Sequence, residues 1–382
     1  MLVATLVFVL TVLALYVLYV GHFMRWHTEN TQGNAYFGKT LQERREIKRK
    51  VIKHAPFVSP FLRAVALVAY NSNKIPKTNY KNVTGPMMTS SNESFKAGSE
   101  YLPTEDDIIV ATQMRCGTTW MQQIVFEILH KGEGNLTDTG YKHINSASAW
   151  IECSQHSGVP LADSPKLGEA QKRVLKTHFP TSLCPYSESA KYIYVTRHPV
   201  SCYASVHDFV STVAGPFAPA QDKFLDWYCS DEFYWTSWPH HVDGWWKWAS
   251  ERDNITFVHF EDLKADPKSV IRMIADFLNV TLTEDEFQKV LAKADFSYMR
   301  EREEYFEMTQ PSVNTVMSKT HFFNGGKSNR HKEVQAHERA QINQFVSEYL
   351  ADSPYPLAEH YPDVTSSEQE NPKVTDEMQP AV

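Results

Sequence analysis

The hydrophobic pattern changes most sharply at the N-terminus, where Leu2 to Val20 carries no charged residue. A run of about nineteen apolar residues is long enough to cross the ~30 Å hydrocarbon core of a bilayer as a helix. A cleaved signal peptide is the alternative, but no basic residue precedes the run and no small-x-small cleavage site follows Gly21. The pattern therefore predicts a transmembrane anchor over residues 1–21.

Basic residues follow the anchor and none precedes it. They are Arg25, Lys39, Arg44, Arg45, Lys48, Arg49, Lys50 and Lys53. By the positive-inside rule this asymmetry predicts a single-pass membrane protein with its C-terminal bulk in the cytoplasm. Five Asn-x-Ser/Thr sequons speak for a lumenal placement instead, so that alternative stays open. They begin at Asn82, Asn92, Asn135, Asn254 and Asn279.

The composition of residues 22–100 predicts a basic juxtamembrane segment followed by a linker. Gln42 to Lys53 has a basic helical pattern that fits either a helix lying on anionic headgroups or a solvated linker helix, and Phe57 to Tyr70 adds an apolar run. Residues 71–100 are rich in Asn, Ser, Thr, Lys and Gly, a composition typical of a loop or tether. We therefore expect the folded domain to begin near Tyr101.

Three strand-like runs follow: Ile108 to Thr112, Tyr192 to Thr196 and Ile255 to Phe260. Helical patterns lie between and after them, notably Thr118 to His130 and Pro267 to Leu278. Strands alternating with helices predict an α/β fold with a P-loop-like parallel sheet flanked by helices. Such sheets bind ligands at the carboxyl ends of their strands.

The predicted domain covers residues 101–352. We expect residues 353–382 to form a disordered tail, because the end of this segment is acidic, polar and without periodicity. A formal net charge of −7 gives no reason to expect a nucleic-acid partner. The five cysteines lack CxxC or Cys/His spacing, so neither a disulfide framework nor a metal site is predicted. Any anion site must therefore be local.

The first chemical motif joins the run that ends at Thr112 to a helix that begins at Thr118. The chain turns through Gly117 between them, and Arg115 stands in the turn. Free backbone N–H groups at a helix N-terminus bind anions, and the glycine lets the backbone approach closely. The Gly-Lys-Ser/Thr of a nucleotide-hydrolysing P-loop is missing from this turn. The motif predicts a phosphate-binding loop.

Residues 112–120, Thr-Gln-Met-Arg-Cys-Gly-Thr-Thr-Trp, resemble the 5′-phosphosulfate loop of the sulfotransferases that use 3′-phosphoadenosine 5′-phosphosulfate (PAPS). Further family motifs follow in order over about residues 101–350. The resemblance implies that PAPS is the donor, that adenosine 3′,5′-bisphosphate (PAP) is the product and that no metal takes part. The implied loop ligands are Arg115, Cys116, Gly117, Thr118, Thr119 and Trp120.

The resemblance also implies catalytic roles. Val174-Leu-Lys-Thr-His-Phe-Pro180 is similar to the family's Lys-Thr-His-Leu-Pro segment, in which the histidine is the general base and the lysine assists. His178 and Lys176 hold these positions. Arg115 stands where the family usually has lysine, so it is expected to stabilise charge on the leaving phosphate but is a poor proton donor. Cys116 as a covalent nucleophile is a weaker alternative.

The remaining donor contacts rest on the resemblance too. Arg197 and Ser205, eight positions apart, match the family's 3′-phosphate site. Phe260 replaces a tyrosine beside the adenine, and Asp295-Phe-Ser-Tyr-Met299 implies that Phe296 sandwiches the adenine opposite Trp120, with Met299 nearby. The C-terminal phosphate loop departs from the family's Arg-Lys-Gly-x-x-Gly, leaving Gly326 and Lys327, with Arg330 and Lys332 as alternatives to the lysine.

Together these motifs predict transfer of a sulfuryl group from PAPS to an acceptor hydroxyl or amine. The acceptor class stays open among small molecules, lipids and glycans, and the oligomeric state is not predicted. Two rivals are a P-loop kinase-like phosphotransferase and a catalytically inactive membrane scaffold that keeps the fold.

Overall fold

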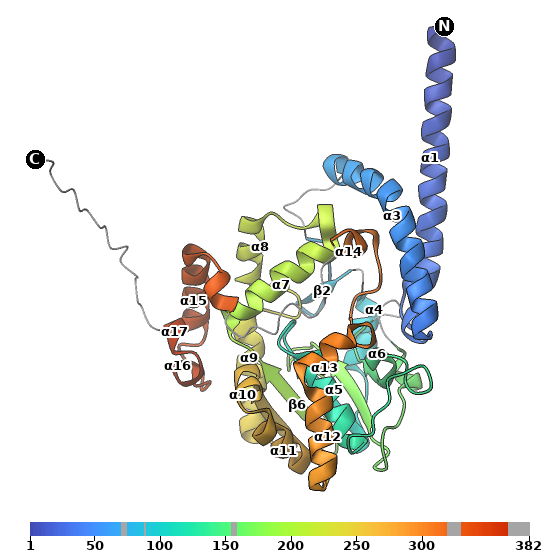
Figure 1. Ribbon diagram of the computed structural model, residues 1–382. Helices are drawn as coiled ribbons and strands as arrows, with labels where there is room; N and C mark the ends of the chain where they lie inside the picture. The colour runs from blue at the N-terminus through green and yellow to red at the C-terminus, as the bar shows by residue number, and fades with distance from the viewer. Residues whose placement is uncertain (70–74, 88, 154–158, 319–329, 366–382) are drawn as a thin grey trace, which may run out of the picture.

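The chain folds into a parallel sheet covered by helices, from which one long N-terminal helix projects (Figure 1). The computed structural model describes residues 1–69, 75–87, 89–153, 159–318 and 330–365. The sheet has the order β4-β5-β3-β6-β7, and every neighbouring pair is parallel. Its strands are β3 (Asp107–Thr112), β4 (Ser148–Trp150), β5 (Arg173–Thr177), β6 (Lys191–Thr196) and β7 (Ile255–His259). The predicted α/β fold is confirmed.

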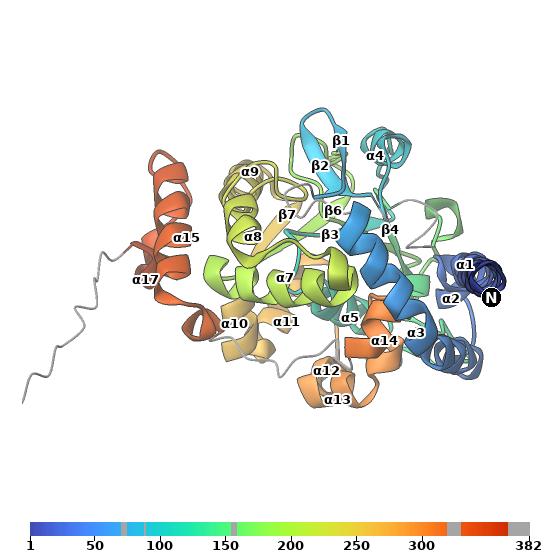
Figure 2. The ribbon, with the colours of Figure 1, turned by 90° about the horizontal axis from the view of Figure 1, so that it is seen from above.

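Alternate residues of the central strands feed two hydrophobic cores. Ile109 and Tyr192 face one core, and Ile108 and Ile193 face the other. The first core is closed by α7 (Pro199–Ala214), α8 (Gln221–Tyr228), α9 (Trp238–Glu251) and α15 (Ala336–Tyr349). The second is closed by α5 (Thr118–Leu129), α11 (Pro267–Phe277), α12 (Glu284–Ala294) and α13 (Phe296–Glu301). Figure 2 shows α9 on one side of the sheet and α5, α11 and α12 on the other. Short helices α6 (Ile144–Ala147), α10 (Phe260–Ala265) and α14 (Val313–Ser318) complete the body.

Part of the expected tether is folded, so that prediction was wrong for the described residues between 75 and 100. They form an antiparallel hairpin, β1 (Lys77–Tyr80) and β2 (Val83–Pro86), followed by helix α4 (Asn92–Ser99). Phe95 is fully buried, and its ring meets the Phe179 ring edge-on with centroids 5.1 Å apart. A few apolar residues thus hold a mostly polar segment against the domain, because they bury enough surface to offset the cost of ordering it.

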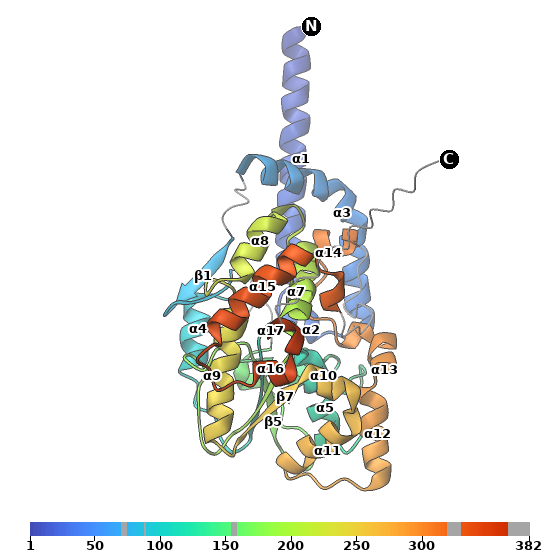
Figure 3. The ribbon, with the colours of Figure 1, turned by 90° about the vertical axis from the view of Figure 1, so that its left-hand side faces the viewer.

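The domain also extends further toward the C-terminus than expected. Helices α16 (Leu357–His360) and α17 (Pro362–Thr365) pack against the body beside α15 in Figure 3. Tyr361 and Val364 are buried, so the polar composition of the tail concealed a docked segment. The rest of the predicted disordered tail, residues 366–382, lies outside the described residues.

The N-terminal region is helical along most of its length: α1 (Leu2–Thr31), α2 (Asn34–Phe37) and α3 (Leu41–Ala69). Both α1 and α3 are long and apolar enough to cross a membrane. The first part of the anchor run projects from the domain (Figure 1), whereas its end, from Tyr16 on, lies beside α3. The Tyr19 hydroxyl is 2.6 Å from His54 Nδ1, which joins the two helices.

Three of the basic residues of α3, namely Arg44, Arg45 and Lys48, contact the domain. Arg44 is 1% exposed and donates to the backbone oxygens of Glu304 and Lys142, the second at 2.8 Å. Arg45 pairs with the Glu304 carboxylate at 2.6 Å, and Lys48 lies 3.5 Å from that of Glu307. These three cations therefore hold one face of α3 to the domain, which corrects the expectation for that face, whereas Arg49, Lys50 and Lys53 are exposed.

Candidate active site

The predicted site segments follow neighbouring strands at one edge of the sheet. His178 comes directly after β5, the loop 113–117 after β3, Arg197 after β6 and Phe260 after β7. The parallel register places Val110 opposite Lys176 and Thr112 opposite Val195. Since the carboxyl ends of parallel strands share an edge, residues far apart in the sequence meet there.

The loop after β3 is shaped by backbone that L-residues rarely adopt. Arg115 has a φ of 67° and Gly117 a φ of 107°. A Cβ at Gly117 would lie 2.9 Å from the Phe260 ring, so glycine is needed for both the conformation and the space. Among the described residues, no side chain caps the N-terminus of α5, where Thr118 begins the helix. The first-turn N–H groups and the helix dipole there suit an anionic ligand.

His178 is fixed in one orientation. Its Nδ1 lies 2.8 Å from the Thr112 carbonyl oxygen and 3.1 Å from Thr112 Oγ1. A carbonyl can only accept, so Nδ1 carries the proton, and in the neutral ring Nε2 keeps its lone pair. Thr112 Oγ1 is also 2.6 Å from Thr118 Oγ1, which ties the histidine to the start of α5.

The surroundings of His178 keep it neutral. Burial lowers its pKa well below the usual value, and the nearby Lys176 ammonium lowers it further. The rings of Trp150 and Trp235 lie 5.2 Å and 4.8 Å from the imidazole. The histidine therefore holds an available lone pair across the physiological pH range inside an aromatic enclosure.

Lys176 lies inside the same enclosure. It is buried, with Nζ 3.7 Å from the centre of the Trp150 ring, and burial lowers its pKa to about 8. An ammonium over an indole face is stabilised by a cation–π interaction. This lysine is therefore charged at neutral pH, but it loses its proton when the pH rises only slightly above neutral.

Two arginines give the site its positive charge. Arg115 donates through Nε to Ser205 Oγ at 3.2 Å, and the Arg197 guanidinium lies over the Phe260 ring at 4.7 Å. Burial, followed by repulsion from Arg197, lowers the pKa of Arg115 to about 10. A half-buried and a buried cation that repel one another fit a ligand that carries several negative charges.

Some of the residues predicted to contact the adenine lie close together in the structure. The Trp120 ring meets Phe260 edge-on at 5.4 Å, and its Nε1 donates to the Ala294 carbonyl oxygen at 2.8 Å. Phe296 begins α13 just after this point, and Met299 on the same helix is buried. Gly326 and Lys327 lie outside the described residues.

Arg330 and Lys332 are the two alternatives to Lys327. Arg330 pairs with Asp208 at 2.6 Å and with Glu333 at 3.3 Å. Its charge is thus already partly balanced by two carboxylates. Lys332 lies in the same short helical turn, residues 330–333.

Cys116 is fully buried, with its Sγ 3.6 Å from Cys202 Sγ. Burial raises the pKa of the Cys116 thiol well above its ordinary value. A cysteine is nucleophilic as the thiolate, so these surroundings disfavour covalent catalysis at this position.

Three supporting residues do not stand out in the sequence. Glu152 is buried and accepts the His178 backbone N–H at 2.6 Å and the Thr177 hydroxyl at 2.8 Å. His241 donates through Nε2 to the His178 carbonyl oxygen at 2.9 Å. Thr112 stands inside the loop motif, which by itself assigns it no role. Glu152 offers no sequence signal, since it follows a strand of only three residues.

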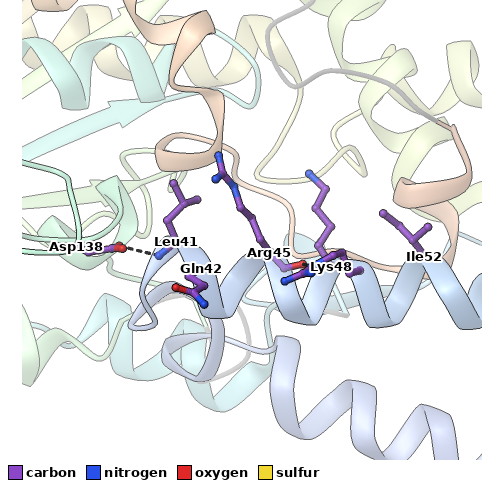
Figure 4. Close-up of a pocket in the computed structure, with 7 residues that line it drawn as sticks. Leu41, Gln42, Arg45, Lys48, Ile52 and Asp138 are labelled. Carbon is purple, nitrogen blue, oxygen red and sulfur yellow. Dashed lines mark hydrogen bonds between the residues drawn. The ribbon is translucent and has the colours of Figure 1, made fainter.

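A surface cavity of about 590 Å³ lies elsewhere, beside the first turns of α3 (Figure 4). It is lined by Leu41, Gln42, Arg45, Lys48, Arg49, Ile52 and Asp138. The cations of Arg45 and Lys48 pair with Glu304 and Glu307, so a phosphate bound here would have to compete with those two carboxylates. The strand edge, which gathers His178, Lys176 and the phosphate loop, is therefore the candidate site.

One group of three potential metal ligands occurs among the described residues: His259, Asp262 and His360. The two imidazoles are stacked with centroids 3.6 Å apart and planes 19° apart. Their lone pairs lie in nearly parallel planes and do not converge on one point, so we assign no metal to this group.

The chain matches the family model of the sulfotransferase domain over residues 105–354. Rat sulfotransferase 1C2 is 29% identical over 232 residues, which cover 59% of this chain and 76% of the rat protein. Human sulfotransferase 2A1 is 25% identical over 285 residues, covering 73% of this chain and 96% of the human protein.

Solved structures show the same fold. Retinol dehydratase in complex with androsterone and the inactive cofactor PAP superposes with a TM-score of 0.55 at 19% identity, covering 77% of this chain and 96% of the other. A mouse sulfotransferase complexed with PAP gives 0.53 at 18% identity, covering 72% and 95%. The expectation of a PAPS-dependent sulfotransferase is confirmed, and this chain belongs to the sulfotransferase family.

Proposed function

We propose that this protein transfers the sulfuryl group of PAPS to an acceptor hydroxyl or amine that binds between His178 and the phosphate loop. The observation that carries the proposal is the fixed tautomer of His178. Its protonated Nδ1 is held by Thr112, so Nε2 is the atom left to take a proton from the acceptor. General-base catalysis needs such a positioned lone pair.

The donor would be held by the strand edge. The first-turn N–H groups of α5 and the hydroxyls of Thr118 and Thr119 suit the 5′-phosphosulfate, and Arg197 with Ser205 suits the 3′-phosphate. The two solved structures that contain PAP are consistent with this donor class. Trp120 and Phe296 would sandwich the adenine, with Phe260 beside it.

In the transfer step the acceptor oxygen forms a bond to sulfur while the bond from sulfur to the 5′-phosphate oxygen breaks. The acceptor proton moves to His178 Nε2, and the electron pair of the broken bond stays on the phosphate. Lys176 and Arg115 stabilise that growing charge. Their low exposure strengthens the effect, since charges interact more strongly away from water.

We further propose that α1 anchors the protein in a membrane with the domain in the cytoplasm. Its apolar residues from Leu2 to Leu18 are largely exposed, which a soluble protein would not tolerate over such a length. Asn254 weakens the lumenal alternative, because its amide donates to the carbonyl oxygens of Ser187 and Ala190 at 3.0 and 2.8 Å and so serves the fold. The acceptor class stays a small molecule, lipid or glycan that bears a hydroxyl or amine.

The test is a radiolabel transfer assay on the detergent-solubilised full chain, with labelled PAPS and a broad acceptor panel. We expect His178→Ala to lose ~10² to 10⁴-fold in turnover while PAP affinity stays unchanged. His240→Ala is the matched control, since His240 lies on α9 with its side chain 39% exposed. If His178→Ala keeps more than about a tenth of the wild-type turnover, the general-base role fails.

The same assay separates the remaining alternatives. Transfer of phosphate from labelled ATP would favour the kinase, which the family match argues against. Binding of PAP without turnover on any acceptor would favour the inactive scaffold. Transfer from PAPS alone supports the sulfotransferase.

A further inference from the structure

The second half of α3, residues 57–68, is largely apolar on every face. Arg63 is its one charged residue. Phe57, Leu67 and Val68 are 63%, 87% and 89% exposed, so the domain does not cover them. Val58, by contrast, is fully buried. A helix that is apolar all round needs an apolar environment on its outer side as well.

This half of α3 begins beside the anchor. The Tyr16 hydroxyl donates to the Phe57 carbonyl oxygen at 2.8 Å, and the Tyr16 and Phe61 rings meet edge-on at 6.2 Å. Tyr16 lies four residues before the Val20 end of the apolar run, or about 6 Å along a helix that rises 1.5 Å per residue. Phe57 therefore lies level with the membrane-embedded part of α1 rather than below it.

The helix then turns away from α1. Pro56 and Pro60 lie inside α3, and proline removes a backbone hydrogen bond and bends a helix. In Figures 1 and 3 the first half of α3 runs alongside α1, whereas the second half runs across it. If α1 crosses the bilayer, the second half of α3 has the direction of a helix that lies in the plane of the bilayer.

We propose that residues 57–68 are a second membrane contact, an interfacial helix seated in the leaflet from which α1 emerges. Arg63 would extend from it to the lipid phosphates, as long basic side chains do at membrane surfaces. The proposal rests on the anchoring role of α1 and adds to it a surface whose partner is the lipid bilayer.

The contact of residues 57–68 with the bilayer would also orient the active site. α14 packs against α3, and Asn314 on α14 donates to the carbonyl oxygens of Val213 and Ala214 at the end of α7. α7 begins two residues after Arg197 and ends at the residues that Asn314 contacts, so α14 and the length of α7 connect α3 to the donor site. The strand edge would thus lie on the side of the domain that faces the bilayer.

The experiment places one fluorescent amino acid at Leu67 in the full chain, reconstituted in vesicles of phosphatidylcholine and phosphatidylserine. Quenching by lipids brominated on the acyl chain is compared with quenching by aqueous iodide. Leu102 is the matched control, an exposed leucine (82%) that precedes β3 at the opposite edge of the sheet. Leu6 in α1 is the membrane reference.

The proposal expects Leu67 to behave like Leu6, with strong lipid quenching and shielding from iodide, while Leu102 shows the reverse. Iodide quenching of Leu67 equal to that of Leu102, with Leu6 still quenched by lipid, overturns the interfacial helix and leaves the anchor standing. Iodide quenching of Leu6 as well would overturn the anchor and the interfacial helix together.

Discussion

Thr112 and His178 are joined by two contacts to the same ring nitrogen: the Thr112 carbonyl oxygen and hydroxyl lie 2.8 Å and 3.1 Å from His178 Nδ1. The carbonyl fixes the tautomer, and the hydroxyl links the ring to Thr118. The arrangement couples the proposed base to the loop that is proposed to bind the donor, although the two segments are 66 residues apart.

Thr112→Val should therefore slow turnover without unfolding the protein. Valine keeps the shape of this fully buried side chain but removes the hydroxyl, and one neutral hydrogen bond is worth about 0.5–1.5 kcal/mol, or roughly two- to tenfold in rate. Thr112→Ser should restore the rate. Equal rates for the valine variant and the wild type in single-turnover measurements would mean that the hydroxyl does not position His178.

Arg197→Ala should weaken donor binding far more than it slows saturated turnover. The proposed partner of Arg197, the 3′-phosphate, is remote from sulfur and is held equally in ground and transition states. A charged hydrogen bond of this kind is worth roughly 1.5–3 kcal/mol, or about ten- to a hundredfold in affinity. Calorimetric titration with PAP measures it directly.

Arg272→Ala is the control for that experiment. Arg272 pairs with Glu284 on the surface at 2.8 Å, with its side chain 52% exposed, so its loss should change little. An unchanged PAP affinity in the Arg197 variant would remove Arg197 from the donor site.

Gly117→Ala should damage the loop itself. The φ of 107° is unfavourable for alanine, and the new Cβ would press on the Phe260 ring at 2.9 Å, together costing on the order of 1–3 kcal/mol. Loss of PAP affinity with a lowered melting temperature is the expected result. Gly21→Ala, whose Cβ meets nothing within 4 Å among the described residues, should leave both quantities near wild type.

The sequence predicted the parts of the fold that follow from local pattern. The runs at β3, β6 and β7 are apolar and end in polar residues, so their strands and the site edge could be located from the local sequence alone. The β1–β2 hairpin could not be, because its polar composition hides the fact that Val83 is buried in the main core. Tertiary contact decided that segment, as it often does for short strands.

The site divides in the same way. His178 and Arg197 stand in motifs that local sequence displays, whereas Glu152 and Thr112 act through partners that the sequence does not reveal. The basic stretch of α3 shows most clearly what the local sequence cannot predict. Arg44 binds the backbone at Glu304, 260 residues away, so a pattern typical of a surface helix conceals a buried arginine.

The pH dependence of turnover gives the final prediction, because it reports on His178 and Lys176 separately. The active form needs His178 neutral. Burial and the Lys176 charge lower the pKa of His178 well below 6.5, so activity should fall only when the pH drops below that ordinary value. An acid limb between pH 6 and 7, which an unperturbed imidazole would give at its ordinary pKa of about 6.5, is not expected.

Lys176 determines how the activity changes at alkaline pH. It must be charged to stabilise the leaving phosphate, and its pKa of about 8 in the free enzyme means that kcat/KM for PAPS should fall as the pH rises through about 8. In kcat the same limb should lie at higher pH, because a bound phosphate favours the ammonium. Lys176→Arg should remove the limb from kcat/KM, since arginine stays protonated. A limb near pH 8 that persists in Lys176→Arg would assign it to another group and take Lys176 out of the charge-stabilising role.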